Sequence, residues 1–222
     1  MEHSTVPVKT GTIPFAYNGE TFETYYKLFG DLAARTRDPL LVLHGGPGLV
    51  HDYLVPFCDL TAHASIPVLL YDQLGSGLSS HVKGKENDWW TIDLFAAQLQ
   101  SVISFFDIGA SFNLAGHSWG GVLASEFAVR YQPAGLKHLI LSNSLADFGL
   151  WTESTRQLMQ SFPQDVQEGL QLGMSDPKKY HAALLVFHKR HGLMGDVFPE
   201  PYIYTLEQAL GEKGDMTVLY AP

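Results

Sequence analysis

The residues best suited to chemistry in this sequence form the segment Gly116-His117-Ser118-Trp119-Gly120, which fits the pattern G-x-S-x-G. An apolar run precedes the segment and a helical run over 121–131 follows it, so we expect Ser118 at the apex of a sharp turn between a strand and a helix. Glycines at 116 and 120 permit that turn, which holds the serine in a strained conformation and projects its hydroxyl above the sheet. The pattern therefore predicts that Ser118 is a catalytic nucleophile.

Two segments are expected to donate main-chain hydrogen bonds to the oxyanion that forms when a serine attacks a carbonyl. Trp119 would offer its amide at a helix N-terminus, where the helix dipole favours negative charge. The segment His44-Gly45-Gly46-Pro47-Gly48 follows a buried strand, and its glycines let main-chain N–H groups approach a ligand oxygen. Gly45 or Gly46 is the candidate second donor. A plain glycine-rich turn is the alternative, but two such motifs, each closing a strand, favour the catalytic interpretation.

The elements around these motifs have the pattern of an α/β protein. Short apolar runs alternate with amphipathic ones, which is typical of a mostly parallel sheet covered by flanking helices. Asn18-Gly19 suits a type I′ turn, so an opening hairpin is predicted from strands over 12–17 and 21–28. Apolar residues at i, i+3, i+4, i+7 spacing predict a helix over 92–106. Buried strands are predicted at 40–43, 68–71, 112–115 and 139–141.

The pattern changes near residue 147, where strand-like runs give way to helical segments punctuated by proline and glycine. We therefore predict two parts, an N-terminal part of the core over 1–146 and a helical cap region over 147–222. A last apolar run over 218–220 could begin a further extended segment. Aromatic residues of the cap are candidates for lining a pocket, although most aromatic residues at helical spacing belong to a core. They are Trp151, Phe162, Tyr180, Phe187, Phe198, Tyr202 and Tyr204.

Composition narrows the class of partner. The formal net charge of −9 argues against nucleic acid or an anionic membrane as the main partner, because binding to phosphates needs clustered cations. Cys58 is the only cysteine, so there is no intrachain disulfide framework. The N-terminal residues have neither the charged nor the apolar region of a secretory signal, and no run approaches a membrane span. We therefore expect an intracellular, cytoplasmic protein.

Three segments together carry a family resemblance: 44–48, Tyr-Asp-Gln-Leu-Gly-Ser-Gly-Leu-Ser at 71–79, and 116–121. In combination they resemble the proline iminopeptidase family of α/β-hydrolases, which includes related amino-acid amidases. One departure is Leu74, where the family commonly has arginine. The resemblance implies removal of an N-terminal residue, often proline, from a small peptide, aminoacyl amide or ester through an acyl-enzyme on Ser118.

The base and acid that would activate Ser118 are harder to find. In this fold the triad runs in the order Ser, Asp or Glu, His, with the last two on loops after later strands. Most of the sequence after Ser118 is helical in character, so we expect the C-terminal strands of the fold to be absent from it. The resemblance implies that the acid, the histidine and an amine-binding carboxylate mostly lie beyond residue 222. His181, His188 and His191, with Asp176, Asp196 and Glu207 nearby in sequence, are less favoured as a surrogate.

Alternative functions stay open at this point. An esterase or lactonase is possible on the same scaffold, because fold and nucleophile do not fix the acyl group. A truncated, non-catalytic product is the third possibility, because Ser118 without its base would lose several orders of magnitude in rate. No cofactor is implied, since Gly75-Ser-Gly77 lacks the third glycine of a dinucleotide fingerprint. The i, i+3 pair His188 and His191 lacks a third ligand, so we expect no metal site.

Overall fold

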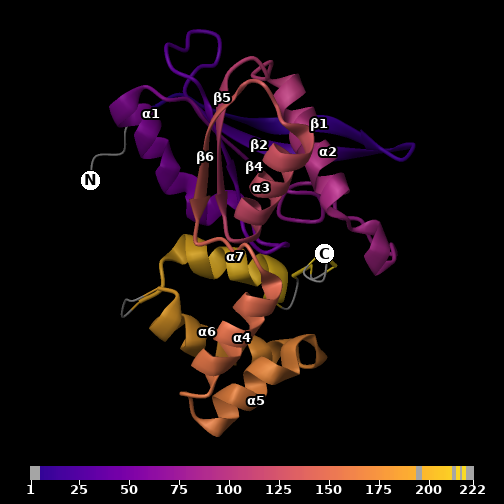
Figure 1. Cartoon of the computed structure of the whole chain (residues 1–222), viewed down its shortest axis with the longest axis vertical. Helices are drawn as coiled ribbons and strands as arrows, with labels where there is room; N and C mark the ends of the chain where they lie inside the picture. The colour runs from indigo at the N-terminus through magenta and orange to yellow at the C-terminus, as the bar shows by residue number, and fades with distance from the viewer. Residues whose placement is uncertain (1–5, 194–196, 212–213, 216, 219–222) are drawn as a thin grey trace.

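A mixed, mostly parallel sheet of six strands forms the centre of the chain (Figure 1). The computed structural model describes residues 6–193, 197–211, 214–215 and 217–218. The sheet order is β1-β2-β4-β3-β5-β6, in which β1 and β2 are antiparallel to their neighbours and the other four strands are parallel. The strands are β1 (Val8–Tyr17), β2 (Glu20–Phe29), β3 (Leu40–Leu43), β4 (Val68–Tyr71), β5 (Phe112–His117) and β6 (Leu136–Ser142).

The opening hairpin is confirmed, together with its turn. β1 and β2 pair from Val8↔Phe29 to Tyr17↔Glu20. The two residues between them, Asn18 and Gly19, have φ of 50° and 81°, which is the pair of positive φ angles that a type I′ turn requires. The hairpin then joins the parallel part of the sheet through antiparallel pairing of β2 with β4.

Helices cover both faces of the sheet. Side chains alternate between the two faces along a strand, so an apolar strand presents apolar side chains on both faces. Leu41, Leu43 and Leu69 point to the face covered by α2 (Ile92–Phe105) and α3 (Trp119–Tyr131). The opposite face, which includes Val42 and Leu70, packs against η1, a 3₁₀ helix over His51–Cys58, and lies on the side of α1 (Asp59–Ala64). The sequence predicted α2 and α3 but not η1 and α1, whose apolar residues have no long helical period.

The strand β6 lies at one edge of the sheet, and in the described part of the chain no strand pairs with its outer side. Leu139, Ile140 and Leu141 are therefore 37%, 42% and 51% exposed. The prediction of a strand here is confirmed, but the prediction that the strand is buried is wrong. An apolar run indicates a strand, but it does not indicate whether the strand has neighbours on one side or on both.

In the described part of the chain four α-helices follow the sheet, as the change of pattern near residue 147 predicted. They are α4 (Phe148–Met159), α5 (Gln164–Leu172), α6 (Pro177–His191) and α7 (Glu200–Leu210), with a short 3₁₀ helix η3 (Gly173–Ser175) between α5 and α6. Figure 1 shows them gathered beyond the carboxyl ends of β5 and β6, with α7 next to the sheet. The division at 146/147 stays a prediction. Leu219 and Tyr220, of the predicted segment over 218–220, lie outside the described residues.

α7 is fastened to the core by a buried hydrogen bond. The Val50 amide donates to the Thr205 hydroxyl over 2.8 Å, and Thr205 is fully buried. This contact holds α7, and with it the helical region formed by α4 to α7, against the loop that follows β3. No helix in the described part of the chain is both long and apolar enough to cross a bilayer.

Candidate active site

Ser118 lies where β5 ends and α3 begins, at φ 54° and ψ −121°. Positive φ is rare for a residue with a side chain, so the backbone is strained at this position, as predicted. The turn is possible only because its neighbours are glycines. A Cβ on Gly116 would lie 2.2 Å from the Gly120 carbonyl oxygen, and one on Gly120 would lie 2.4 Å from the Leu43 carbonyl oxygen. Ser118 remains half-buried.

The loop after β6 fastens this turn from the other side. The Ser118 amide donates to the Ser142 carbonyl over 3.0 Å. The Ser144 hydroxyl donates to the Ser118 carbonyl, also over 3.0 Å. Ser144 comes so close that a Cβ on Gly121 would lie 2.4 Å from its hydroxyl oxygen. Main-chain bonds on both sides therefore fix the direction of the serine side chain.

The glycine loop after β3 lies directly beside Ser118. A Cβ built on Gly45 would come within 3.1 Å of the Ser118 Cβ. The Gly45 amide donates to the Tyr53 hydroxyl over 2.7 Å, a contact that the sequence did not predict. Gly46 has φ 117°, and neither its amide nor that of Trp119 has an acceptor in the described part of the chain. Of the two candidate glycine donors, Gly46 is thus the one whose N–H is available.

Tyr53 links the glycine loop to His117. Its hydroxyl accepts from the Gly45 amide and is hydrogen-bonded to the His117 Nδ1 over 2.8 Å. Burial raises the pKa of Tyr53 and lowers that of His117, so the phenol keeps its proton and the imidazole stays neutral. His117 is therefore engaged with Tyr53, and the Ser118 hydroxyl has no hydrogen-bond partner among the described residues. The expectation that His117 is not the general base agrees with this arrangement.

A pocket of about 380 Å³ opens between the core and the helical region. On its far wall the Tyr202 hydroxyl is hydrogen-bonded to the His188 Nδ1. Burial lowers the pKa of His188 and raises that of Tyr202 to about 12, so both groups are neutral at pH 7. No carboxylate belongs to the wall as far as the structure describes it. The lining residues are Leu49, Tyr53, His117, Ser142, Asn143, His188, Gly192, Leu193, Tyr202 and Thr205.

The other candidate residues of the helical region have varied surroundings. Tyr202 lines the pocket, whereas Phe162 packs with Phe187 in a separate small core, as expected for most of these aromatic residues. Trp151 and Tyr204 are 52% and 40% exposed. Among the described residues no group of three His, Cys, Asp or Glu side chains could hold a metal ion. Asp196, an acid considered for a surrogate triad, lies outside the described residues.

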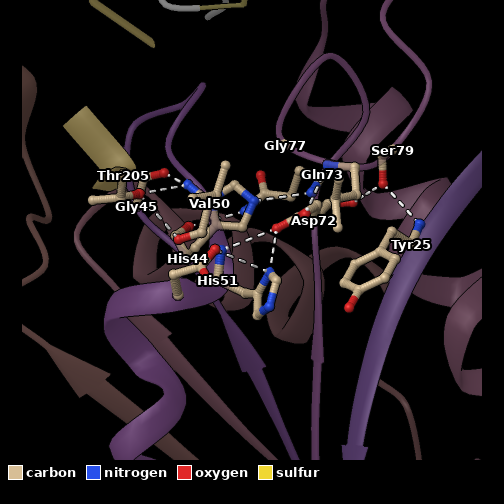
Figure 2. Close-up of polar contacts among 12 residues, drawn as sticks. Tyr25, His44, Gly45, Val50, His51, Asp72, Gln73, Gly77, Ser79 and Thr205 are labelled. Atoms are coloured by element: carbon tan, nitrogen blue, oxygen red, sulfur yellow. Dashed lines mark hydrogen bonds and ion pairs between the residues drawn. The ribbon is translucent and has the colours of Figure 1, made fainter. Parts of the chain in front are cut away.

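Asp72, near the start of the segment 71–79, is a buried anchor for the loops around the site (Figure 2). One carboxylate oxygen accepts from the His51 amide at 3.0 Å and from its Nδ1 at 2.8 Å. The other accepts from the Leu78 amide at 3.0 Å. Burial raises the pKa of Asp72, but the hydrogen bond and charge of His51 outweigh burial and hold that pKa below its ordinary value. Gly77 has no space for a side chain here, since a Cβ would lie 2.3 Å from the carboxylate.

A strained serine between a strand and a helix, facing a glycine loop, agrees with the comparison against known families. The family model that matches residues 38–186 is described as alpha/beta hydrolase fold. The chain belongs to the α/β-hydrolase family. Among curated relatives of this chain, the proline iminopeptidase of Lactiplantibacillus plantarum is 36% identical over 144 residues, or 65% of this chain and 48% of that protein. The proline iminopeptidase of Lactobacillus delbrueckii subsp. lactis is 33% identical over 187 residues, or 82% of this chain.

Solved structures similar to this chain also support the α/β-hydrolase fold. The crystal structure of VinJ is 36% identical with a TM-score of 0.84, over 95% of this chain and 69% of that one. The crystal structure of the Mycobacterium smegmatis proline iminopeptidase is 29% identical with a TM-score of 0.76, over 96% and 70%. The resemblance to proline iminopeptidases is thus confirmed. This chain spans 48% and 63% of the lengths of the two curated relatives named above.

The sequence motifs locate the site around Ser118 but not the contacts that connect the motifs. Tyr53 lies in a helical segment with no motif of its own, and its bond to His117 joins two distant segments. Tyr202 is one of the aromatic residues predicted as candidates for lining the pocket, but its bond to His188 was not predicted. Ser144 follows an exposed strand, and nothing in its spacing indicates a contact with Ser118. The one available signal was the Asp72-Gln73 pair after β4, because loops at the carboxyl ends of adjacent parallel strands meet.

Proposed function

We propose that this α/β hydrolase is a serine hydrolase that cleaves an N-terminal aminoacyl residue, often proline, from a peptide or amide through an acyl-enzyme on Ser118. The observation that carries the proposal is the strained, half-buried Ser118 beside the glycine loop. Similarity to proline iminopeptidases supports the substrate class. The activity is proposed for the whole protein, since this chain spans less than two thirds of those relatives' own lengths.

Each residue of the site has a role in the proposed reaction. The Ser118 hydroxyl attacks the carbonyl carbon and loses its proton to the general base of the complete protein, and the carbonyl oxygen acquires negative charge as the tetrahedral intermediate forms. Collapse of the intermediate breaks the C–N bond, and the leaving amine takes up that proton. The free amides of Gly46 and Trp119 donate to that oxygen, and the start of α3 adds the favourable end of its helix dipole. Gly45 stays bonded to Tyr53 and keeps the loop in place. The acid and histidine of the triad are not among the described residues that contact Ser118.

Covalent labelling tests this proposal directly. The protein expressed from its complete reading frame is treated with a fluorophosphonate probe and, in parallel, assayed with a fluorogenic prolyl amide. We expect one label, at Ser118, and turnover that Ser118→Ala abolishes. The matched control is Ser104→Ala, which changes an exposed serine of α2 and should leave both signals unchanged. Absence of labelling in the complete protein would instead favour a non-catalytic product.

An esterase or lactonase is the second candidate, and the pocket gives it a specific argument. An aminopeptidase must hold a charged ammonium group, and buried charges need a partner of opposite sign. The pocket wall, as described, is lined by neutral groups such as the His188–Tyr202 pair. A panel of aminoacyl amides, N-blocked amides and simple esters separates the two functions. Faster turnover of esters without a free amine would favour the esterase.

A further inference from the structure

The loop after β4 lies beside the glycine loop, because β4 and β3 are adjacent parallel strands and β3 also pairs with β5. The side chain of Gln73 on this loop reaches both of the other motifs. Its amide nitrogen donates to the His44 carbonyl over 2.9 Å. Its amide oxygen accepts from the Trp119 indole nitrogen, also over 2.9 Å. One side chain thus joins the segment before Gly45 to the residue after Ser118.

The main chain of Gln73 adds a second connection to the glycine loop (Figure 2). The Gln73 amide donates to the His44 Nε2 over 2.9 Å. Since that nitrogen accepts, the imidazole proton is on Nδ1, which donates to the Gly45 carbonyl over 2.9 Å. Burial lowers the pKa of His44 and keeps the ring neutral, so the acceptor at Nε2 is preserved. The glycine loop is therefore held through the carbonyls of His44 and Gly45 and through the His44 imidazole.

These contacts are shielded from water and specify one orientation of the amide. Gln73, His44 and Trp119 are 1%, 0% and 2% exposed. A reversed Gln73 amide would place its NH₂ against the indole N–H and its oxygen against the His44 carbonyl, leaving four buried polar groups unmatched. Only a side chain with one donor and one acceptor at this length fits. Glutamate lacks the donor, and a methionine of similar shape lacks both groups.

We infer that Gln73 is a positioning residue that sets the distance between the two oxyanion donors, the glycine loop and the Trp119 amide. The inference rests on the proposed function, because it assigns Gln73 to that same site. Both donors must lie about 2.7–3.1 Å from one oxygen, and a misplacement of about 1 Å can cost about 10²-fold in rate. Gln73 touches neither the nucleophile nor the donor amides, so it acts through His44 and Trp119.

The test uses the complete protein and three variants at this bridge. Gln73→Met removes both halves, and Gln73→Glu keeps the acceptor for the indole but removes the donor. Trp119→Phe removes the indole N–H and part of the ring volume but keeps an aromatic side chain. Turnover is followed on whichever substrate the wild type accepts, the prolyl amide or a simple ester. We expect kcat to fall at least tenfold in Gln73→Met while KM stays within about twofold, because the oxyanion forms only in the transition state. Combining Gln73→Met with Trp119→Phe should add little further loss.

Gln98→Met is the matched control, because Gln98 is an equally buried glutamine that joins Leu74 and Thr24 and touches neither donor segment. It should lower the melting temperature as much as Gln73→Met does and leave kcat within about threefold of the wild type. Equal kcat in the two glutamine variants would overturn the role of Gln73 while leaving the proposed function intact. A wild-type protein that is not labelled at Ser118 would refute the proposed function, and the role of Gln73 with it.

Discussion

Gly120 offers a sharp quantitative test of how the site is built. A Cβ at this position would lie 2.4 Å from the Leu43 carbonyl oxygen and 2.6 Å from that of His44, and both are backbone atoms that cannot rotate away. An ordinary contact begins near 3.4 Å, so Gly120→Ala must separate α3 from the end of β3 by about 1 Å. That displacement moves Ser118 and the Trp119 amide away from the glycine loop.

Two effects of Gly120→Ala follow from this displacement. Overpacking of this kind costs about 1–3 kcal/mol, which lowers the melting temperature by about 2–4 °C for each kcal/mol in a protein of this size. The misplaced donors should slow fluorophosphonate labelling of Ser118 about 10²-fold. Both are measured on the complete protein, by thermal unfolding and by the time course of labelling.

The control for this experiment is Gly109→Ala. Gly109 has no positive φ, and the nearest atom to its Cβ would be the Ile103 Cγ2 at 3.5 Å, which is an ordinary contact. This variant should be labelled at the wild-type rate. If Gly120→Ala and Gly109→Ala were labelled equally fast, the close approach of α3 to β3 would not control the reactivity of Ser118, and the reasoning would be refuted.

Three further predictions concern stability, each measured by chemical or thermal unfolding. Asp72→Asn should cost about 3–5 kcal/mol, because it breaks a buried pair with His51, whereas Asp52→Asn at a partly exposed carboxylate should cost less than about 0.5 kcal/mol. Acid should destabilise the protein, because the pKa values of His44 and Asp72 are both lower in the folded state than in the unfolded state. The stabilising contribution of each group is therefore present at neutral pH and is lost as the pH falls. The loss begins below about pH 6.5 for His44 and below about pH 4 for Asp72. Constant stability from pH 7 to 4 would contradict this. Thr205→Val removes the buried acceptor that holds α7 and should cost about 1–3 kcal/mol, with faster proteolysis of the helices after residue 147 than of the core.

Much of the fold could be predicted because its signals are local. The type I′ turn at Asn18-Gly19, the four-residue strands β3 and β4 and the long helix α2 each carry a pattern contained within one segment. The strained turn at Ser118 is of the same kind, since its flanking glycines reveal it. The observed residue ranges of these elements therefore lie close to the predicted ones.

Other features depend on contacts between distant segments, which a single sequence does not encode locally. The occupation of the Gly45 amide by Tyr53 and the bridge from Gln73 to Trp119 require the folded arrangement of three loops. Burial of β6 was wrongly predicted because the same apolar run fits an edge strand or a central one. The types of the side chains thus indicated where the candidate site lies. Only the tertiary arrangement shows which main-chain N–H groups remain free to donate to a substrate oxygen.

The serine turn takes part of its support from β6, which pairs with β5 alone in the described part of the chain. Ser142 and Ser144, which hold the main chain of Ser118, stand at the end of β6, whose outer edge is open among the described residues. Fraying of that end would release the Ser118 amide to solvent and relax the turn. Amide hydrogen exchange at Ser118 should consequently follow the opening of β6 rather than that of the central strands. The order of β6 at this end would in this way govern how long Ser118 keeps its strained conformation.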